Sequence, residues 1–439
     1  MNSSSDAMDY LSFTLPVSLP GLVSTNPADS PHMPLPQTAI PPEVPGLNDL
    51  SPERVGTDFG METSFKLVPD DYNVLKSVIL MVKLDALANT GPFTPNPSAT
   101  PPTYGARYPS DVLCHAIDVI QWQVGGLVVQ EIEGDKIHFR QAIELGEEDY
   151  ARVSEAQKIV DFAGDRATLA TVPQWVMLEI PLWWTETAAK HWHQYCCQRQ
   201  TRIIIKWRHS DYIIQTDNPA KVKPLPATGA TSPYIMDMFL RFRVSALDTA
   251  VKETYTNAVK SQGGNGLNYL LKFSQKQERQ LVPATATKAS IQLTNFNKPT
   301  NFVWYVCRNE EDLQPDVSKN NRWNLQETSW HYLDASGHKL WPRTSNEYNK
   351  LEVNSKYFLN TRTGRPSIYH FLHTDYPDAT QYPMGCIEYG KLQNPTVFLE
   401  WTSALSKNML VDVYAECYDY VRLVVTSDNR SAVSLEQPI

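Results

Sequence analysis

The feature that most constrains the fold is a period-two alternation of apolar residues in short segments, which proline-rich stretches separate. Residues 203–207 and 238–244 carry apolar side chains at every second position, with several charged side chains between them. Such alternation predicts strands with one buried and one solvated face. Residues 74–84 are largely apolar in both alternate sets, so this strand is expected inside a sandwich. The 32 prolines disfavour long helices, and an all-β chain is predicted.

The same pattern continues along the rest of the chain. Residues 115–129 are expected to form a strand pair that turns at Gly125-Gly126, because glycine readily adopts the positive φ of a tight hairpin turn. In residues 411–418 one alternate set is apolar and the other is polar or aromatic, which predicts a half-buried strand. Residues 215–233, rich in Pro, Thr and Ala, are expected to be a surface loop. Further strands are expected at residues 269–273, 291–293, 302–307, 396–401 and 421–425.

One short helix is predicted between two β-rich halves. Apolar residues recur at every fourth position from Leu247 to Val259, Asp248 can cap the start of the helix, and Gly263-Gly264 can end it. At 439 residues the chain is long enough for at least two cores. We therefore expect two consecutive β-sandwiches, each of the size that an eight-stranded jelly roll needs.

The first 55 residues contain ten of the prolines. Each proline removes one backbone donor and fixes φ, so neither a helix nor a central strand is expected there. Several apolar side chains lie between residues 11 and 22. From them we infer an extended arm that docks on another surface; the alternative is a flexible leader without a contact.

Charge and hydropathy narrow the classes of function. The net charge is −9, the pI is near 5.6, and no segment gathers five or six basic residues, so direct contact with nucleic acid is not expected. No apolar run reaches the roughly 18 residues of a membrane span, and residues 1–10 lack the pattern of a signal peptide. A soluble protein made in the cytosol is expected. The six cysteines fit neither a disulfide framework nor a Cys-x-x-Cys site, and are expected to be buried apolar residues.

Two segments look like ligand sites, and a structural role is favoured for both. Two histidines and two cysteines could be metal ligands, but their spacing is not that of a zinc finger. These residues are His191, His193, Cys196 and Cys197. Residues 263–266 are glycine-rich like a phosphate-binding loop, but neither Lys-Ser nor Lys-Thr follows, so a flexible linker is expected.

Two further groups could be catalytic. His370 and His373 lie near Asp375 in the sequence, but nothing supplies a nucleophile with its base, so a solvated loop is favoured. A glycosidase could use a pair of carboxylates, although the sequence gives no separation between them. The candidates for such a pair are Glu179, Glu186 and Asp237. No catalytic, cofactor-binding or metal-binding residue is assigned, and the chain is not expected to be an enzyme.

Residues 291–306 consist of two apolar strand segments joined through an Asn-Lys-Pro bend. This segment resembles the start of the second jelly roll in the double jelly-roll major capsid proteins of large eukaryotic DNA viruses, of the nucleocytoplasmic large DNA virus type. In that family an aliphatic strand is followed by Phe-Asn, one residue, Pro, and a strand with Trp flanked by valines. The residues in those places are Phe296, Asn297, Pro299, Trp304 and Val306.

Other motifs of this family occur in the same order along the chain. The tripeptide Leu247-Asp248-Thr249, the helix after it and residues 268–270 resemble the connection between the two jelly rolls. Weaker similarities are residues 58–69 to the first strand, 115–126 and 133–137 to a paired hairpin, 181–184 to a Pro-Leu-aromatic strand, and 411–423 to the last strand pair. Residues 191–199 depart from the family's pattern.

The resemblance implies an all-β double jelly roll, that is, two consecutive eight-stranded antiparallel jelly rolls with a short linking helix and an extended N-terminal arm. The boundaries are then 1–55 for the arm, 56–246 for the first jelly roll, 247–267 for the linker, 268–426 for the second jelly roll and 427–439 for a C-terminal tail.

The resemblance also implies a structural protein of the virion, made in the host cytoplasm. Three copies would form a homotrimer with a pseudo-hexagonal outline, and such capsomers would tile an icosahedral shell. Implied partners are neighbouring capsomers, penton proteins and minor capsid proteins, with an inner membrane as a possible contact of the arm. Residues 91–109, 215–233 and 310–343 are expected as loops at the outer end or between neighbours. The alternative is a β-sandwich carbohydrate-binding protein or glycoside hydrolase, which a monomer with glycan binding or turnover would favour.

Overall fold

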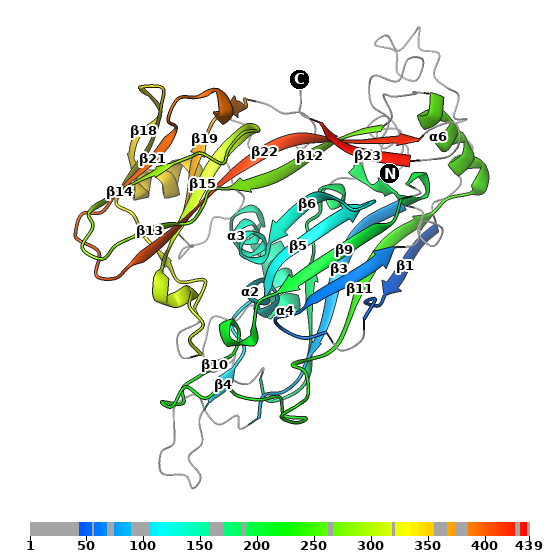
Figure 1. Cartoon of the computed structure of the whole chain (residues 1–439), viewed down its shortest axis with the longest axis horizontal. Coiled ribbons are helices and arrows are strands. Elements are labelled where there is room, and N and C mark those ends of the chain that lie inside the picture. Colours follow the sequence, from blue (N-terminus) through cyan, green and yellow to red (C-terminus); the bar gives the residue numbers. More distant parts are fainter. Residues whose placement is uncertain are drawn as a thin grey trace.

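The computed structural model describes most of the chain between residues 44 and 436 (Figure 1). The described ranges are 44–54, 57–67, 74–88, 105–158, 170–186, 190–197, 199–261, 267–317, 321–354, 367–374, 385–425 and 431–436. Among the helices in these ranges, none combines the length and the apolar character that a membrane crossing requires.

The first half of the chain forms one jelly roll from two antiparallel sheets. One sheet has the strand order β1-β11-β3-β7, with β8 also paired to β3, and the other has the order β2-β9-β5-β6. The strands are β1 (Val44–Leu50), β2 (Glu62–Leu67), β3 (Val74–Leu84), β5 (Ile117–Val124), β6 (Leu127–Glu133), β7 (Gln174–Glu179), β8 (Trp192–His193), β9 (Thr201–Trp207) and β11 (Ile235–Ala246). A separate short pair consists of β4 (Ala106–Arg107) and β10 (Gln215–Thr216).

The second half repeats the same strand order. Its first sheet is β12-β22-β15-β19 and its second sheet is β14-β21-β17-β18. The strands are β12 (Leu267–Lys276), β14 (Lys288–Gln292), β15 (Pro299–Asn309), β17 (Trp330–Ala335), β18 (His338–Ser345), β19 (Ile368–Leu372), β21 (Thr396–Glu400) and β22 (Met409–Val425). Short strands extend its first sheet: β13 (Gln280–Val282), β16 (Leu325–Gln326), β20 (Ile387–Glu388) and β23 (Ser431–Glu436). In each half the first, eighth, third and sixth long strands form one sheet and the other four form its partner, so the predicted pair of eight-stranded jelly rolls is confirmed.

Helices connect and flank the two jelly rolls. Helix α6 joins them, and α2, α3 and α4 precede or follow the β5–β6 hairpin of the first. The helices are α2 (Val112–Ala116), α3 (Gly134–Glu144), α4 (Glu147–Gln157), α6 (Thr249–Ser261) and α7 (Asn346–Tyr348). Single turns are η1 (Trp183–Thr185), η3 (Gln194–Cys196), η4 (Ser210–Tyr212), η6 (Glu310–Leu313), η7 (Asn349–Asn354) and η8 (Tyr389–Lys391).

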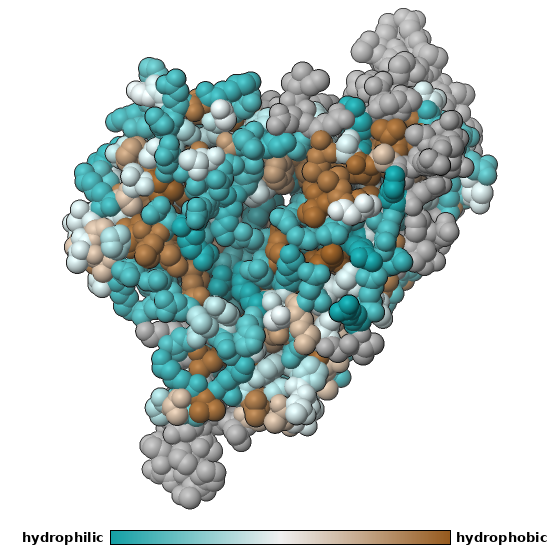
Figure 2. Space-filling model, in the orientation of Figure 1, coloured by the Kyte–Doolittle hydropathy of each residue, from teal (hydrophilic) through white to brown (hydrophobic). Residues whose placement is uncertain are grey.

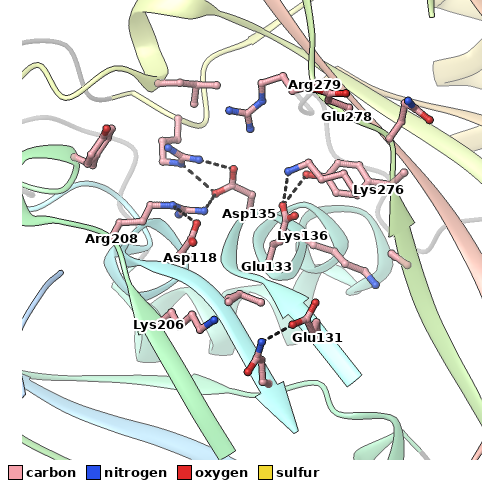
Figure 3. Close-up of a pocket in the computed structure, with 18 of the residues that line it drawn as sticks. Asp118, Glu131, Glu133, Asp135, Lys136, Lys206, Arg208, Lys276, Glu278 and Arg279 are labelled. Atoms are coloured by element: carbon pink, nitrogen blue, oxygen red, sulfur yellow. Dashed lines mark hydrogen bonds and ion pairs between the residues drawn. The ribbon is translucent and has the colours of Figure 1, made fainter. Parts of the chain in front are cut away.

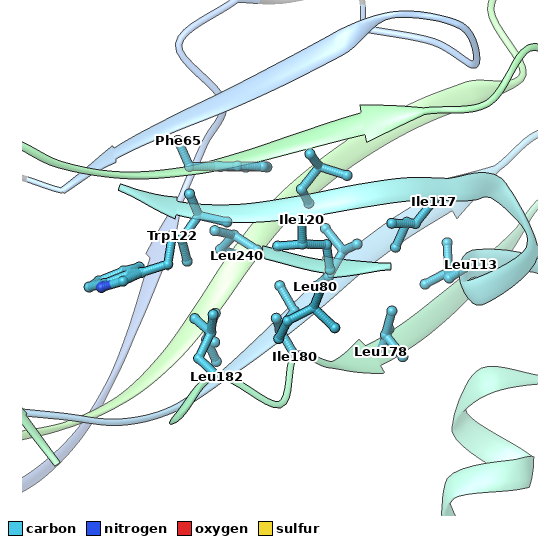
Figure 4. Close-up of a cluster of buried hydrophobic side chains, with 14 of the residues drawn as sticks. Phe65, Leu80, Leu113, Ile117, Ile120, Trp122, Leu178, Ile180, Leu182 and Leu240 are labelled. Atoms are coloured by element: carbon cyan, nitrogen blue, oxygen red, sulfur yellow. The ribbon is translucent and has the colours of Figure 1, made fainter. Parts of the chain in front are cut away.

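The core of the first jelly roll lies between its two sheets. Side chains such as Leu80 and Leu240 from one sheet meet Ile120 and Trp122 from the other, and all four are fully buried (Figure 4). Burial of one such side chain stabilises the fold by roughly 2 kcal/mol. The apolar residues of the alternating pattern therefore lie in the core between the two sheets, as predicted.

Strands of the second half complete this same core. Tyr269 and Leu271 on β12, and Val421, Leu423 and Val425 on β22, belong to the cluster of buried side chains that fills the first jelly roll. The Tyr269 ring lies 5.0 Å from that of Trp183. Strand β22 is 17 residues long, and its C-terminal half pairs with β12 and β23 rather than β15. The two jelly rolls therefore share one core.

The predicted hairpin turn and the predicted helix cap are confirmed. Gly125 and Gly126 have φ of +61° and +87° and join β5 to β6. Helix α6 begins where expected, because the Asp248 carboxylate accepts a hydrogen bond from the Ala250 backbone N–H at 2.9 Å. Gly263-Gly264 lies outside the described residues. Five of the six cysteines are buried and all six are free thiols, as expected of apolar filling residues.

Several predicted elements are wrong. Residues 115–116 end α2 and residues 134–137 begin α3, because both turns pack at the end of the β5–β6 hairpin instead of extending it. The segment 181–184 runs into the turn η1 rather than a strand. The predicted loop 310–343 contains the β17–β18 hairpin, which belongs to the second sheet. Residues 411–425 form one continuous strand.

The ends of the chain also differ from the expectation. Residues 44–50 of the predicted arm form β1, which pairs with β11 along its full length. This strand lies at the edge of its sheet and pairs on one side only. An edge strand tolerates a proline such as Pro45, which has no backbone N–H to donate. Residues 431–436 of the predicted tail form β23. The rest of the arm, residues 1–43, lies outside the described residues.

Candidate functional site at the junction of the jelly rolls

Helix α3 of the first jelly roll faces the second jelly roll. A Cβ on Gly134, its first residue, would lie 2.5 Å from the carbonyl oxygen of Ile117 and still closer to that of Cys114, so only glycine fits here. Asp135 follows in the first turn, where the partial positive charge of the helix N-terminus favours a carboxylate. The tight start of α3 therefore fixes the position of one buried acid.

Asp135 is surrounded by three arginines from both halves of the chain. Its carboxylate accepts hydrogen bonds from Arg308 Nη1 at 2.7 Å and from Arg322 Nη2 at 2.8 Å, both in the second jelly roll. Arg208, which follows β9 in the first jelly roll, lies 3.1 Å away. Asp135 is 1% exposed and Arg308 is fully buried. This one carboxylate therefore joins the two jelly rolls through charge-assisted hydrogen bonds.

The network continues into the second jelly roll at Asp412 on β22. Arg308 Nη2 donates to Asp412 Oδ2, and Arg279 Nε donates to Asp412 Oδ1 at 2.7 Å. Acids and bases thus alternate from Arg208 through Asp135, Arg308 and Asp412 to Arg279; the three central groups are buried, and the two terminal arginines are partly exposed. Because each buried charge has a neighbour of opposite sign, the desolvation cost of the group is offset.

The protonation states follow from this arrangement. Burial alone would raise the pKa of Asp135, but the three arginines outweigh it and hold that pKa well below its ordinary value. The pKa of Asp412 is lowered for the same reason, with Arg308 as the largest opposing cause. Both carboxylates are therefore charged at neutral pH, and the network is a set of ion pairs.

A second contact lies beside the first. Glu416 on β22 accepts a hydrogen bond from Trp304 Nε1 at 3.0 Å and faces Lys136 of α3 at 3.6 Å. Burial would raise the pKa of Glu416, but Lys136 and neighbouring cations lower it to about 2. The Trp304 ring stacks on that of Tyr414 at 4.3 Å. Charged and aromatic groups of β15 and β22 therefore pack together against α3.

Trp323 anchors the second jelly roll in the first. Its ring stacks on His138 at 3.8 Å and lies edge-on to Phe139 at 5.7 Å. Its Nε1–H donates to the backbone oxygen of Ser110 at 2.8 Å. Since the preceding residue is Arg322, a two-residue segment supplies both an ion pair and an aromatic plug, as in the anchors of protein interfaces.

An open cleft of about 940 Å³ remains above this network. Its walls come from β5, β6, α3, β9, β12 and the residues that follow β12, and they include Glu131, Lys206, Lys276 and Glu278 (Figure 3). Lys276 Nζ lies 2.6 Å from Glu133 Oε2 across the junction. Figure 2 shows the hollow between the two halves lined mainly by hydrophilic residues. The walls carry both signs of charge, and many of these charges pair with each other.

Of the four residues weighed as metal ligands, for which a structural role was predicted, three lie in the packed core. The His193 ring stacks on Tyr255 of α6 at 4.5 Å, and Cys196 Sγ lies 3.7 Å from Thr256 Oγ1. Cys197 is also fully buried, and His191 is partly exposed. In the described part of the chain no three His, Cys, Asp or Glu side chains gather in a way that could hold a metal ion.

The expected solvated loop at His370 is wrong. His370 lies on β19 and is fully buried, and the Asn349 side-chain amide donates to its backbone oxygen at 2.9 Å. His373 follows the strand, with Nε2 2.8 Å from the hydroxyl of Tyr389. Asp375 and residues 263–266 lie outside the described residues. The apolar strand pattern around His370 is the signal that could have identified its burial.

The carboxylates weighed as a glycosidase pair do not meet. Glu179 on β7 is opposite Ile79 of β3, whereas Asp237 on β11 is opposite Lys83 of the same strand. Four residues along a strand and two strand spacings separate their backbones by about 16 Å, which exceeds the separation of roughly 5–10 Å that glycosidase pairs need. Glu186 is engaged with Lys190 Nζ at 2.7 Å.

The buried histidines make the fold sensitive to acid. Five histidines have a lowered pKa, and burial is the largest cause for each of them. The pKa is about 4 for His373 and well below the ordinary value for His115. It is about 3 for His193, His331 and His370. They are neutral in the folded state, while in the unfolded state they bind protons below their ordinary pKa of about 6.5.

We expect the free energy of unfolding to fall as the pH drops from 7 to 5, by about 2 kcal/mol per buried histidine. The loss should begin near pH 6.5, well before the junction carboxylates protonate. Denaturant unfolding at a series of pH values measures it. His331→Gln, which can keep an acceptor near Asn349 Nδ2, should make the pH dependence shallower by about one proton. A stability that stays constant between pH 7 and 5 would contradict this prediction.

Comparisons with known proteins agree with the architecture. No family model matches the chain, and no curated protein matches its sequence. Among solved structures, VP54 of the virus PBCV-1 matches with a TM-score of 0.65 at 12% identity, covering 89% of this chain and 97% of that one. The Faustovirus major capsid protein matches with a TM-score of 0.62 at 8% identity, covering 87% and 90%. The mavirus major capsid protein matches with a TM-score of 0.51 at 9% identity, covering 89% and 90%.

At sequence identities this low, the structural similarity establishes the fold alone. The coverage shows what share of each chain has that fold. Nearly the whole length of each of these chains is included, so the match extends over both jelly rolls. The strand order repeated in the two halves and the linking helix α6 lie within it. This chain therefore has the double jelly-roll fold of viral major capsid proteins.

Proposed function

We propose that this protein is a major capsid protein that forms the shell of an icosahedral virus. The observation that carries the proposal is the junction, because buried ion pairs and a shared core hold two jelly rolls of the same topology side by side as one body. Three such bodies around a three-fold axis present six similar sandwiches. That outline is close to a hexagon, which can tile a shell with a single kind of chain.

The role is structural rather than catalytic. The charged groups at the centre of the junction are engaged with one another, and the candidate carboxylates Glu179 and Asp237 are too far apart for a glycosidase pair. The fold shared with major capsid proteins supports the same conclusion. The chain acts by association with copies of itself.

The proposal also covers partners and location. The protein is made in the host cytoplasm and resides in the virion shell, where it contacts neighbouring capsomers, penton proteins and minor capsid proteins. Residues 215–233 and 310–317 pack together at one end, with the Thr216 backbone N–H donating to the Val317 oxygen at 2.8 Å and Lys221 paired with Asp316 at 2.7 Å. The exposed Val222 and Leu225 lie in the first of these segments. This end is a candidate for contacts outside the trimer.

Light scattering of the purified chain tests the proposal. The soluble building block should have three times the chain mass of 49.7 kDa, about 149 kDa, as expected of a closed cyclic assembly. A strictly monomeric protein that binds or hydrolyses glycans would contradict the proposal and favour the alternative class of β-sandwich protein.

Deletion of residues 1–43 should leave the trimer intact and lower the yield of assembled particles. We expect a loss of at least ~10-fold, because a weak arm contact repeated over many copies acts as a multivalent interaction. The arm would contact neighbouring capsomers or an inner membrane. Particle yield after gradient centrifugation measures the effect.

A longer deletion, of residues 1–50, is the control for that experiment. It also removes β1, which pairs with β11 from Val44 to Leu50, and it should lower the melting temperature as well as the particle yield. If the 1–43 deletion assembles as well as the complete chain, the arm has no role in assembly.

A further inference from the structure

We propose that the open cleft between the two jelly rolls binds a multivalent phosphate anion of the tripolyphosphate class. The cleft has a volume of about 940 Å³, which lies in the range of small-molecule sites. Both halves of one chain line it, so the site is complete within a single copy. The inference goes beyond the proposed function, because it assigns a ligand to the chain itself and does not depend on shell assembly.

The charged network at the base of the cleft has an excess of positive charge. Its six bases are Lys206, Arg208, Lys276, Arg279, Arg308 and Arg322, and the four acids that pair with them are Asp118, Glu133, Asp135 and Asp412. Six bases and four acids leave a net charge of +2. Glu131 and Glu278 also belong to the walls, but both are exposed, where solvent screens their charge more than it screens a partly buried one. An added anion is therefore favoured at the base of the cleft.

The carboxylate of Asp135 is shared among more cations than it can balance. Its Oδ2 accepts hydrogen bonds from Arg308 Nη1 at 2.7 Å and from Arg322 Nη2 at 2.8 Å. Its Oδ1 accepts from Arg322 Nε at 3.1 Å and lies 3.1 Å from Arg208 Nη2. Burial, opposed by Asp135 and aided by Arg208 and Arg308, lowers the pKa of Arg322 to about 10. These like charges lie close together, and a further anion would reduce their repulsion.

Two cationic side chains, one from each half of the chain, have donors that a ligand can use. Arg279 Nε donates to Asp412 Oδ1 at 2.7 Å. A guanidinium carries five N–H groups, and within the described residues the Nη groups of Arg279 make no hydrogen bond. Lys206 Nζ has neither a hydrogen bond nor an ion pair with any residue that the structure describes. In Figure 3 Arg279 projects from the second jelly roll and Lys206 from the first, on either side of Asp135. Both halves of the chain therefore offer donors to one ligand.

The floor of the cleft indicates the length of the ligand. Lys206 of β9 and Glu133 of β6 are both register partners of Val119 on β5, the strand between them. Two strand spacings separate the backbones of Lys206 and Glu133 by about 10 Å, and Lys276 Nζ lies 2.6 Å from Glu133 on the far side. A single phosphate group contacts one side of such a floor, whereas a chain of three can extend from Lys206 toward Lys276 and Arg279. A multivalent phosphate therefore fits better than a single one.

The chemistry of the donors selects the class of ligand. A planar guanidinium presents two parallel N–H groups that match two oxygens of a phosphate, and the ammonium of a lysine adds a compact positive charge. A metal cation is disfavoured, because each of the four carboxylates at the base already pairs with a lysine or an arginine. A phosphate chain therefore matches both the charge of the network and the type of donor that it offers.

Calorimetric titration of the complete chain with sodium tripolyphosphate tests the inference. We expect one anion to bind per chain, in whatever oligomeric state the chain adopts. At about 100 times the dissociation constant the melting temperature should rise by at least ~2 °C, because the ligand binds the folded chain and not the unfolded one. The reference titration uses sodium chloride at the same ionic strength, so that the screening of surface charges is matched.

Two substitutions in the cleft locate the site. Lys206→Gln removes one ammonium group, and Arg279→Lys keeps a positive charge beside Asp412 but removes the guanidinium fork. Each should raise the dissociation constant for tripolyphosphate at least ~10-fold, since a hydrogen bond to a charged group is lost. The matched control is Lys391→Gln, at a side chain that is 77% exposed on η8 and outside the cleft, and it should bind the anion as the wild type does. Circular dichroism checks the fold of each variant. If Arg279→Lys is unfolded, Lys206→Gln alone decides.

A separate titration with ATP distinguishes the two sources of a phosphate chain. ATP that binds as tightly as tripolyphosphate, or more weakly, agrees with recognition of the phosphate groups themselves. Binding of ATP without binding of tripolyphosphate would overturn the inference. So would binding that both cleft variants leave unchanged, or a tripolyphosphate titration that does not differ from the sodium chloride reference. None of these results concerns the mass of the building block, so the inference and the proposed function can fail separately.

Discussion

A fragment of residues 44–261 is expected to remain unfolded when it is expressed alone, although it contains all eight long strands of the first jelly roll. Its core lacks five side chains that the second half supplies: Tyr269, Leu271, Val421, Leu423 and Val425. Their burial stabilises the fold by about 10 kcal/mol in total, which is as large as the whole stability of a typical domain. Far-UV and near-UV circular dichroism of the fragment measure the result.

Co-expression provides the matched control for the fragment. When residues 262–439 are supplied as a second chain, β12 and β22 can cover the open side of the first jelly roll, and the two fragments should purify as a folded complex. A fragment 44–261 that shows a cooperative thermal transition and near-UV signal by itself would contradict the shared core, and would mean that the two jelly rolls fold independently.

Replacement of Asp135 by alanine is expected to destabilise the protein by about 4 kcal/mol, because it removes the carboxylate that pairs with Arg322 and leaves Arg308 with Asp412 alone. Arg308 is fully buried and Arg322 is 7% exposed, so neither can turn to water without moving the backbone. The comparison variant is Asp149→Ala, whose partner Arg152 is 77% exposed on α4. Loss of that surface pair should cost less than about 0.5 kcal/mol. Denaturant unfolding of both variants gives the two values.

The same network can be tested in reverse. A quadruple variant with Asp135→Leu, Arg308→Met, Arg322→Met and Asp412→Leu removes the buried charges at the centre of the network together and should recover much of the stability that Asp135→Ala loses. Equal effects of Asp135→Ala and Asp149→Ala would show that the junction does not depend on its buried charges, and the rigid connection between the jelly rolls would need another explanation.

The strands could be predicted from the sequence because their signals are local. Alternation along Val74–Leu84, the Gly125-Gly126 turn and the Asp248 cap each lie within one element. Physical rules for one strand or one turn are sufficient there. The resemblance to the capsid family implies that these strands form two consecutive jelly rolls, which no local pattern contains.

The junction could not be predicted because its partners are far apart in sequence. Arg308 contacts Asp135 across 173 positions and Asp412 across 104. On a strand, Asp412 and Glu416 look like a solvated face, and that is why residues 411–418 were expected to be half-buried. Only the approach of α3 from the other jelly roll removes water from them. A charged residue on an apolar strand is thus compatible with a solvated surface and with a buried ion pair.

Electron microscopy of the purified building block is the decisive test of the proposal that three copies of this chain form one capsomer. We expect a three-fold symmetric particle with a pseudo-hexagonal outline and six similar lobes, two from each chain. A solitary particle with two lobes and the mass of one chain, at concentrations where shell proteins assemble, would contradict it.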